Sequence, residues 1–463
     1  MHIQAQKLAY VHFLLYFEGT LILEATVKNV VYGNKNEFFL LISIFFRTFA
    51  PRLTITNRMM NVYFWFVRLA ALFGHQKAKL LVRGQKYALR EAKEWAGQLD
   101  NNSSVIWIHI ASVGEFEQVR PIIERLRQEQ TNHKILLTFF SPSGYEARKD
   151  YPMVDKVLYL PFATVRNAKK WVKALPLEMV IFVKYEFWPS YLKQLKKNHI
   201  PTYLISAIFR PNQLFFKPWG RGYRQLLSCF SHIFVQDLDS QQLLAKYHIN
   251  SVTIAGDTRF DRVLEIKNQA QVLPILDGFS TGAQRVLIAG STWPKDEQYI
   301  TRYLTEHEDT KLVLVPHELH PSHLHQIFQL FEGRYIRYTE ATPLNIDKCR
   351  ILLVDTIGLL SSIYRYGHVA YIGGGFGVSI HNTLEAAVYG IPVIFGPKWH
   401  KFREAKGLLQ AQAALSVRNY KEFASALDTA FINQQMMGER ATQYVQSESG
   451  ATNIIYNALF QQK

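Results

Sequence analysis

From residue 105 onward, short apolar runs alternate with amphipathic stretches, and this alternation most restricts the folds open to the chain. Runs that are apolar throughout are typical of parallel strands covered by helices on both faces. The first series is VIWIHI (105–110), KILLTFF (134–140), MVIFV (179–183), PTYLISA (201–207), HIFVQ (232–236) and VTIAG (252–256). The second is RVLIAG (285–290), KLVLV (311–315), ILLVD (351–355), HVAYIGG (368–374) and IPVIF (391–395). The sequence therefore predicts an α/β fold with two Rossmann-like, doubly wound domains.

Residues 266–284 separate the two series and show little periodicity. This stretch contains Pro274 and Gly278, and the combination predicts a linker. A chain of 463 residues is too long for one hydrophobic core and suits two domains. In doubly wound sheets ligands bind beyond the carboxyl ends of the strands, so candidate site residues are sought there.

The charge balance predicts an acidic partner. The formal net charge is +16, which suits a nucleic acid, an anionic membrane face or a phosphorylated substrate. The only cysteines, Cys229 and Cys349, form no CxxC pair or His/Cys cluster, so neither a disulfide framework nor a structural zinc site is expected.

The N-terminal region is apolar and aromatic. Residues 38–46 (FFLLISIFF) and 61–74 (NVYFWFVRLAALFG) both fall short of the roughly 20 residues that a spanning helix needs. A basic flank follows the second stretch, which favours an anionic membrane face. We interpret 60–75 as a membrane-embedded or interfacial anchor helix; a core helix is the alternative. Residues 1–58 form an extension of uncertain status, with Met59 or Met60 as a possible functional start.

The stretch GGGFGVSIHNTLEAAVYGIPVIFGP (373–397) combines glycines with the predicted start of a helix. Glycines allow close backbone approach, and a helix starting near Asn382 presents free N–H groups to a phosphate. The segment from Asn382 to Glu385 also matches a capping box, in which Glu385 only ties back to the cap. Both interpretations stay open on the local sequence.

Two acidic positions follow strands of the first series. Glu115 lies in the turn after run 105–110, where it is either a charge at a helix N-terminus or a general base on a hydroxyl. Asp237 and Asp239 resemble a metal-binding DxD, but they begin a predicted helix and are better explained as a helix cap.

Ordered motifs along residues 60–463 resemble the 3-deoxy-D-manno-octulosonic acid (Kdo) transferases of lipopolysaccharide synthesis. They are ASVGE (111–115), LTFFSPSGYE (137–146), VLYLPF (157–162), KYEFWP (184–189), AGDTRFD (255–261), GSTWPKDEQ (290–298), DTIG (355–358) and IHNTLEAAVYGIPVIFGP (380–397). The resemblance implies a GT-B glycosyltransferase whose two domains face a cleft, with an N-terminal membrane-associated helix. It also implies an inverting transfer of Kdo from CMP-Kdo to the lipid A precursor, at the cytoplasmic face of the inner membrane and without a bound metal or other cofactor.

The resemblance also implies roles for individual residues. Glu115 matches the family's general base, and Lys184, Glu186 and Arg259 are candidates for transition-state support. The candidates for the CMP site are Pro316, His317, Ile357, Gly358, Leu359, Asn382, Thr383, Leu384 and Glu385. Weaker candidates for the acceptor phosphates, with a solvated basic face as the alternative, are Arg210, Lys217, Arg221 and Arg224.

Several positions depart from the family pattern. KYEFWP stands where the family shows ETELWP, so Lys184 replaces an acid, while Glu186 keeps the second one. Arg259 replaces a lysine, and His317 replaces an arginine in PHELHP (316–321). Leu359 and Ile208 replace a common glutamate and an arginine.

The expected organisation has five parts: an extension (1–58), an anchor with its basic flank (59–100), an acceptor domain (101–270), a CMP-sugar domain (271–440) and a C-terminal helix packing back on the acceptor domain (441–463). The first alternative is a GT-B enzyme that uses a UDP-sugar on another membrane lipid. A basic nucleic-acid-binding protein is a remote alternative, because no compact module of interleaved basic and aromatic residues occurs, and nucleic acid is not expected as a partner.

Overall fold

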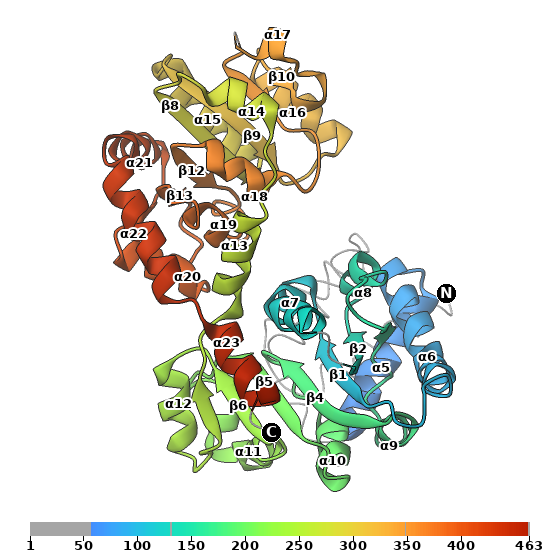
Figure 1. The fold of residues 1–463 in the computed structure, drawn as a ribbon. Helices are drawn as coiled ribbons and strands as arrows, with labels where there is room; N and C mark the ends of the chain where they lie inside the picture. The colour runs from blue at the N-terminus through green and yellow to red at the C-terminus, as the bar shows by residue number, and fades with distance from the viewer. Residues whose placement is uncertain (1–56, 130–131, 348, 462–463) are drawn as a thin grey trace, which may run out of the picture.

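The computed structural model describes residues 57–129, 132–347 and 349–461. Residues 1–56, which include the apolar run 38–46 and almost all of the predicted extension, lie outside the described part. Figure 1 shows two lobes, each built around a sheet.

The first sheet is parallel throughout and has the strand order β3-β2-β1-β4-β5-β6-β7. Its strands are β1 (Val105–Ile110), β2 (Lys134–Phe139), β3 (Lys156–Tyr159), β4 (Leu177–Val183), β5 (Thr202–Ala207), β6 (His232–Val235) and β7 (Val252–Ile254). Every residue of β1 is buried, as expected for a central strand covered on both faces.

The second sheet is also parallel, with the order β10-β11-β9-β8-β12-β13-β14. Its strands are β8 (Arg285–Thr292), β9 (Thr310–Pro316), β10 (Ile336–Arg337), β11 (Ile351–Leu353), β12 (Val369–Ile372), β13 (Val393–Phe395) and β14 (Ala414–Ser416). Each predicted run contains a strand. The sequence did not predict β3, β10 and β14, which are short strands at or next to the sheet edges.

Helices cover both faces of the first sheet. They are α5 (Asn57–Leu72), α6 (Gln76–Ala96), α7 (Val113–Gln128), α8 (Pro142–Arg148), α9 (Val165–Ala174), α10 (Pro189–Lys197), η1 (Leu214–Phe216), η2 (Pro218–Gly220), α11 (Arg221–Leu227) and α12 (Leu238–Ala245). One buried cluster joins Phe64 of α5, Trp171 of α9, Tyr191 of α10 and Phe215 of η1, so these elements share one face. A second cluster includes Phe116 of α7 on the other face.

The second lobe has the same layered plan. Its helices are α14 (Pro274–Ser280), α15 (Pro294–Glu306), α16 (Pro321–Leu330), η3 (Tyr338–Glu340), α17 (Pro343–Ile346), α18 (Leu360–Ile363), η4 (Tyr364–Tyr366), α19 (Leu384–Ala387), α20 (Arg403–Gln410), α21 (Tyr420–Ile432) and α22 (Gln434–Ser447). Two buried clusters, one on each side of the sheet, form its core.

The prediction of a linker at 266–284 is wrong. Helix α13 (Thr258–Asn268) runs into this stretch, and α14 begins at Pro274, whose missing N–H suits the first turn of a helix. Leu276 and Phe279 of α14 are fully buried in the core of the second lobe. Because α14 is short and has few periodic positions, its packing could not be predicted from the sequence.

The C-terminal end of the chain returns to the first lobe (Figure 1). After α22 the chain turns at Gly450, with φ of 106°, into α23 (Ala451–Tyr456) and the π-helical turn η5 (Asn457–Gln461). Asp261 of α13 accepts hydrogen bonds from the backbone N–H of Gly450 (2.5 Å) and Thr452 (2.6 Å). Ile455 packs in the same cluster as Phe116 of α7, which ties the C-terminal segment to the first sheet.

The N-terminal helices α5 and α6 form a hairpin on the first lobe. Phe64 of α5 packs against Phe162 with ring centroids 4.3 Å apart, so part of the predicted anchor helix is covered by protein. Other side chains remain outside, with Leu72 82% exposed and Phe73 69% exposed. Within the described part of the chain, no helix has the length and apolar character needed to cross a membrane.

Candidate active site

Glu115 lies at the carboxyl end of the central strand β1, in the first turn of α7. Its carboxylate accepts hydrogen bonds from the backbone N–H of Ala111 (2.6 Å) and Ser112 (3.2 Å), while the Ser112 hydroxyl accepts from the Glu115 N–H (3.4 Å). This is a complete capping box. The structural role that the sequence left open is therefore real, and the cap also fixes the orientation of the carboxylate.

The environment of Glu115 gives it an unusual acidity for a glutamate. Burial, followed by repulsion from Glu186, raises its pKa to about 7, while the N–H of Ala111, the charge of Lys184 and the N–H of Ser112 oppose the rise. A carboxyl group with this pKa is partly ionised and partly protonated at neutral pH, which is the condition that suits a general base.

Glu186, whose charge acts on Glu115, belongs to a buried hydrogen-bond network. Its Oε2 lies 3.1 Å from His109 Nε2 and accepts a 2.6 Å bond from Trp188 Nε1. His109 Nδ1 lies 2.9 Å from the Thr138 hydroxyl, which also accepts a bond from Trp107 Nε1. These partners hold Glu186 in one orientation, so its effect on Glu115 comes from a fixed point.

Lys184 follows β4, the strand that pairs with β1 in parallel register. The backbone of Lys184 adopts the left-handed conformation, with φ of 64°. This conformation is strained for a residue with a Cβ. Burial, then the charge of Arg259, lowers its pKa, while Asp257, Glu115 and Glu404 oppose the change. Lys184 therefore shares one electrostatic cluster with Glu115 and Arg259.

Arg259, in the first turn of α13, is held by two buried carboxylates. Its Nη1 and Nη2 donate to both oxygens of Glu404 (2.8 and 3.0 Å), and its Nε and Nη2 donate to Asp257 (2.9 and 2.7 Å). Because Glu404 belongs to α20 of the second lobe, this ion pair joins the lobes. Most N–H donors of the Arg259 guanidinium are therefore already bonded to Asp257 and Glu404.

In the second lobe three aromatic rings meet at the carboxyl ends of β8, β9 and β12. The His317 ring stacks on Trp293 (centroids 4.9 Å apart) and on His381 (4.2 Å). Trp293 Nε1 donates to His381 Nε2 (3.2 Å), and burial followed by the charge of His317 lowers the pKa of His381 to about 4. His381 is therefore neutral at physiological pH, with its proton on Nδ1.

The glycines after β12 lie against the protein's own backbone, whereas the sequence suggested close approach to a ligand. A Cβ on Gly373 would lie 2.2 Å from the Ser291 carbonyl oxygen, and one on Gly375 would lie 2.6 Å from Gly396 Cα. The N–H of Gly374 donates to Asp296 (3.0 Å). The interpretation that these glycines admit a ligand is wrong for Gly373 and Gly375, because the protein's own loops fill that space.

The predicted helix near Asn382 is a single turn, α19 (Leu384–Ala387), which is too short to build a large helix dipole. Asn382 Oδ1 accepts from the Leu384 N–H (3.1 Å), and its Nδ2 donates to Glu385 Oε1 (2.8 Å). Glu385 therefore bonds the side chain of Asn382, and the predicted capping box is not formed. Burial raises the pKa of Glu385; the Asn382 bond opposes this rise and Glu117 of the first lobe adds to it.

The other candidates for the nucleotide site lie at neighbouring strand ends. Pro316 ends β9 and is buried, and His317 follows it with an exposed side chain. Ile357, which is 90% exposed, and Gly358, with φ of 93°, lie in the loop between β11 and α18, just before Leu359. Thr383 and Leu384 are fully buried, and the Leu384 N–H already donates to Asn382, so neither residue is exposed to a ligand in this arrangement.

The basic candidates for acceptor phosphates divide into two kinds. Arg210 and Arg221 are exposed and Lys217 is half-buried. Arg224 instead donates through Nη1 to the carbonyl oxygens of Phe215 (2.8 Å) and Lys217 (3.2 Å), so its main contacts are structural.

Asp237 is the N-cap of α12 and accepts a 2.8 Å bond from the Ser240 N–H, as the helix-cap interpretation predicts. Within the described ranges, no group of three or more His, Cys, Asp or Glu side chains is arranged to hold a metal ion.

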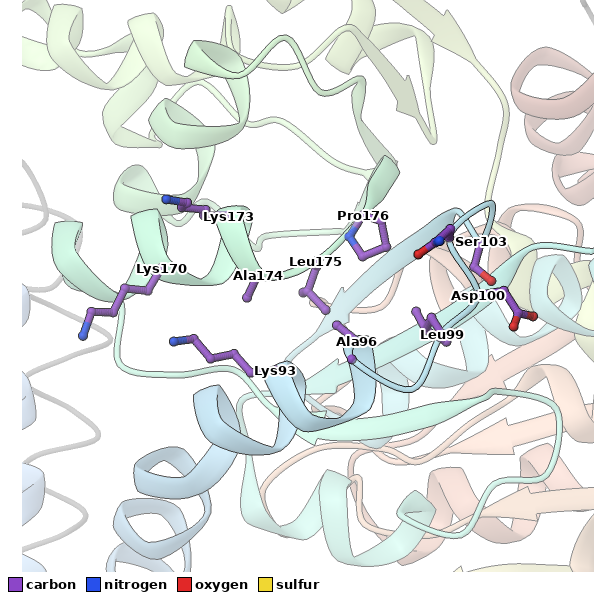
Figure 2. A pocket seen from close by; sticks show the side chains of 12 residues that line it. Lys93, Ala96, Leu99, Asp100, Ser103, Lys170, Lys173, Ala174, Leu175 and Pro176 are labelled. Atoms are coloured by element: carbon purple, nitrogen blue, oxygen red, sulfur yellow. The ribbon is translucent and has the colours of Figure 1, made fainter.

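A hollow of about 730 Å³ lies away from these residues, between the end of α6 and the end of α9 (Figure 2). It is bordered by Lys93, Lys170 and Lys173 and by Pro176, next to the start of β4. The hollow therefore lies at the amino-terminal ends of the strands of the first sheet, whereas Glu115 lies at their carboxyl ends.

The comparisons with known proteins find similarity to one family. Residues 83–262 match the family model of 3-deoxy-D-manno-octulosonic-acid transferases, and this range contains Glu115, Lys184, Glu186 and Arg259. The 3-deoxy-D-manno-octulosonic acid transferase of Aquifex aeolicus is 28% identical over 71% of this chain and 86% of its own length. That of Rickettsia prowazekii is 27% identical over 71% of this chain and 72% of its own length. Over about 71% of its length, the chain is similar to Kdo transferases.

The similarity identifies the protein as a glycosyltransferase, and its fold agrees with that class. UDP-GlcNAc 2-epimerase from Neisseria meningitidis superposes with a TM-score of 0.57 over 78% of this chain and all of that chain, at 14% identity. MurG from Acinetobacter baumannii gives a TM-score of 0.50 over the same shares, at 13% identity. These likenesses support the GT-B-like arrangement of two parallel seven-stranded sheets.

Sequence reasoning missed several residues of the candidate site. Trp293 was visible only as part of the GSTWPKDEQ motif, with no local sign that it stacks on His317. His109 is an unremarkable polar residue in an apolar strand, and Glu404 lies far from Arg259 along the chain. Only the fold brings them next to residues with predicted roles.

Proposed function

We propose that this glycosyltransferase moves Kdo from CMP-Kdo to the phosphorylated lipid A precursor, with inversion and without a metal ion. The observation that carries this proposal is the fixed carboxylate of Glu115, whose pKa is raised to about 7 at the carboxyl edge of the first sheet. A base with this acidity can take a proton from an acceptor hydroxyl at neutral pH.

In the proposed reaction, Glu115 accepts the proton as the acceptor oxygen attacks the anomeric carbon from the side opposite CMP. The bond between that carbon and the CMP phosphate oxygen breaks, and the phosphate leaves with the electron pair. Lys184 shares an electrostatic cluster with Glu115 and provides a positive charge for the anionic groups of the donor. Burial and, to a smaller extent, repulsion from Glu186 keep the pKa of the base raised.

We assign the donor nucleotide to the strand ends of the second lobe. The exposed ring of His317 and the loop Ile357–Leu359 border the proposed site, and Glu385 accepts hydrogen bonds from the ribose hydroxyls. The single-turn α19 offers few free N–H groups, so stabilisation of the leaving phosphate depends more on nearby cations than the sequence predicted.

We further propose that α5 and α6 hold the enzyme at the cytoplasmic face of the inner membrane. Leu72 and Phe73 expose apolar surface, and Lys77, Lys79 and Arg83 follow them on α6. Apolar groups next to cations favour the interface of an anionic bilayer.

The test is incubation of the full chain with CMP-Kdo and the lipid A precursor, followed by mass analysis of the lipid. A mass increase of one or more Kdo residues is expected. Product from a UDP-sugar, with none from CMP-Kdo, would favour the alternative glycosyltransferase. A parallel titration should show CMP quenching tryptophan fluorescence in the wild type more than in Trp293→Phe, because Trp293 lies against His317.

A further inference from the structure

Trp219 is a large aromatic residue on the surface of the first lobe. It lies in η2, between β5 and α11, and is 62% exposed. Phe215 and Phe216 of the preceding turn η1 are buried in the core, so the same short segment places two aromatic rings inside and one outside.

The segment that carries Trp219 is rigidly built. A Cβ on Gly220 would lie 1.8 Å from the Leu214 carbonyl oxygen. Only glycine at position 220 therefore allows η1 and η2 to pack this closely. The Arg224 guanidinium holds the carbonyl oxygens of Phe215 and Lys217, and the Tyr247 hydroxyl donates to Phe216 (3.0 Å). Trp219 is therefore presented to solvent by a fixed scaffold.

The surroundings of Trp219 are basic. Residues 208–227 contain four Lys or Arg side chains (Arg210, Lys217, Arg221, Arg224) and no Asp or Glu. Of these cations, Arg210, Lys217 and Arg221 form no salt bridge with any residue that the structure describes. An exposed aromatic ring among unpaired cations is complementary to an anionic lipid surface.

The segment lies near the site and on the α5 side of the sheet. Among the charges acting on Tyr185, whose pKa is raised chiefly by burial, Arg210 has the largest effect, and Arg259 and Glu115 also act. Phe64 of α5 and Phe215 of η1 belong to one core cluster. In the sheet, β3, which lies next to α5, and β5, which precedes the Trp219 segment, are on opposite sides of β1. Four strand spacings separate β3 from β5, which is roughly 19 Å.

We infer that Trp219, with Lys217 and Arg221, is a second contact with the anionic phospholipid bilayer, in addition to α5. This inference rests on the proposed function, which places the acceptor in a membrane. A single helix at the interface leaves the protein free to rotate about it. Two contacts on either side of β1 fix the orientation, so that the Glu115 edge faces the lipid acceptor.

The test uses the full chain and vesicles of phosphatidylglycerol and phosphatidylcholine in which the lipids carry bromine atoms that quench tryptophan. Wild-type quenching should exceed that of Trp219→Phe. Trp293→Phe, in the second lobe, is the matched control and should lose no lipid-dependent quenching. Lys217→Ser/Arg221→Ser should weaken binding to anionic vesicles, by roughly fivefold for each charge, with little effect on neutral vesicles. Arg418→Ser, an 80% exposed arginine side chain of the second lobe, is the charge control.

Equal quenching in the wild type and Trp219→Phe would overturn the inference, as would a double variant that binds anionic vesicles as tightly as the wild type. A dimer that forms without lipid and dissociates in Trp219→Ala would assign this surface to a second copy of the chain instead. CMP-dependent transfer to detergent-dispersed acceptor by the wild-type chain is measured separately, so a failure of this inference is distinguishable from a failure of the proposed function.

Discussion

Arg259 and Glu404 form a bidentate ion pair that connects the two lobes, with N–O distances of 2.8 and 3.0 Å. Arg259 lies in the first turn of α13, which also packs on α7, and Glu404 lies on α20 beside the second core. Asp257 and Glu404 expose only 1% and 2% of their side chains, so each depends on the guanidinium for neutralisation. The pair therefore fixes the approach of the lobes next to the Glu115 edge.

Replacing Arg259 by alanine should strongly destabilise the protein, because two buried carboxylates lose their partner. We expect a loss of about 3–5 kcal/mol in the free energy of unfolding. Arg259→Lys should recover only part of it, since an ammonium group cannot form both bidentate contacts. Urea denaturation measures the effect; a second change, Glu404→Gln, should restore part of the stability of Arg259→Ala. An unaltered denaturation midpoint in Arg259→Ala would show that water replaces the pair at no cost.

Glu115→Gln should lower turnover by roughly 10²–10⁴ while leaving CMP binding intact, because the amide cannot accept the proton. In the wild type, activity should rise as the pH passes through about 7, where Glu115 ionises. Turnover measured across pH checks both points. Near-wild-type turnover in the Gln variant would remove Glu115 from the mechanism.

The same variant should be more stable than the wild type at pH 8. The folded-state pKa of Glu115 is raised from 4.5 to about 7, so folding favours the protonated carboxyl, and this contribution is lost as the pH rises through 7. The amide avoids that loss, and we expect a gain of about 1–2 kcal/mol at pH 8 and none below pH 4.5. Thermal melts at both pH values would reveal it; equal stability at pH 8 would contradict the raised pKa.

Lys184→Met should shift the rise in activity to higher pH, because the positive charge of Lys184 opposes the raised pKa of Glu115. Methionine keeps much of the side-chain length without the charge. Lys93→Met, on the opposite edge of the sheet, is the matched control and should keep the wild-type profile. A Lys184→Met profile that coincides with the wild type would exclude electrostatic coupling between these residues.

Activity should survive EDTA, since the proposed reaction relies on side-chain cations. Asp237 and Asp239 begin α12, and the Asp237 carboxylate already bonds the Ser240 N–H. Turnover assays with and without chelator provide the measurement. Loss of activity with EDTA, followed by recovery with Mg²⁺ or Mn²⁺, would return these two aspartates to consideration as ligands.

The strand pattern predicted both sheets because fully buried parallel strands require long apolar runs. The same criterion failed for β10 and β14, which are two and three residues long and partly exposed. It also failed for α14, whose burial depends on Ile346 and other distant residues of the second lobe. Short elements carry too few residues to show a period, and tertiary packing decides their structure.

The candidate site was predicted where one residue combines a motif with a strand end, as Glu115 does. The raised pKa of Glu115 could not be predicted, because it depends first on burial in the folded protein and then on Glu186, which lies at a different strand end. The contacts of the glycine-rich turn could not be predicted for a related reason. A glycine signals close approach but does not identify the neighbour, and for Gly373 and Gly375 the neighbour is the protein itself.

For Glu385, the sequence leaves both a structural and a binding role open. Its carboxylate bonds the Asn382 side chain (2.8 Å) and not the cap backbone, so a Gln at this position can keep that contact through its carbonyl oxygen. Stability should therefore change little in Glu385→Gln. If Glu385 accepts hydrogen bonds from the ribose hydroxyls, the loss of charge should weaken CMP binding by about 1–2 kcal/mol. Calorimetric titration with CMP, beside a thermal melt of the same variant, separates the two roles. Unchanged affinity would leave Glu385 with a purely structural function in the turn that it shares with Asn382.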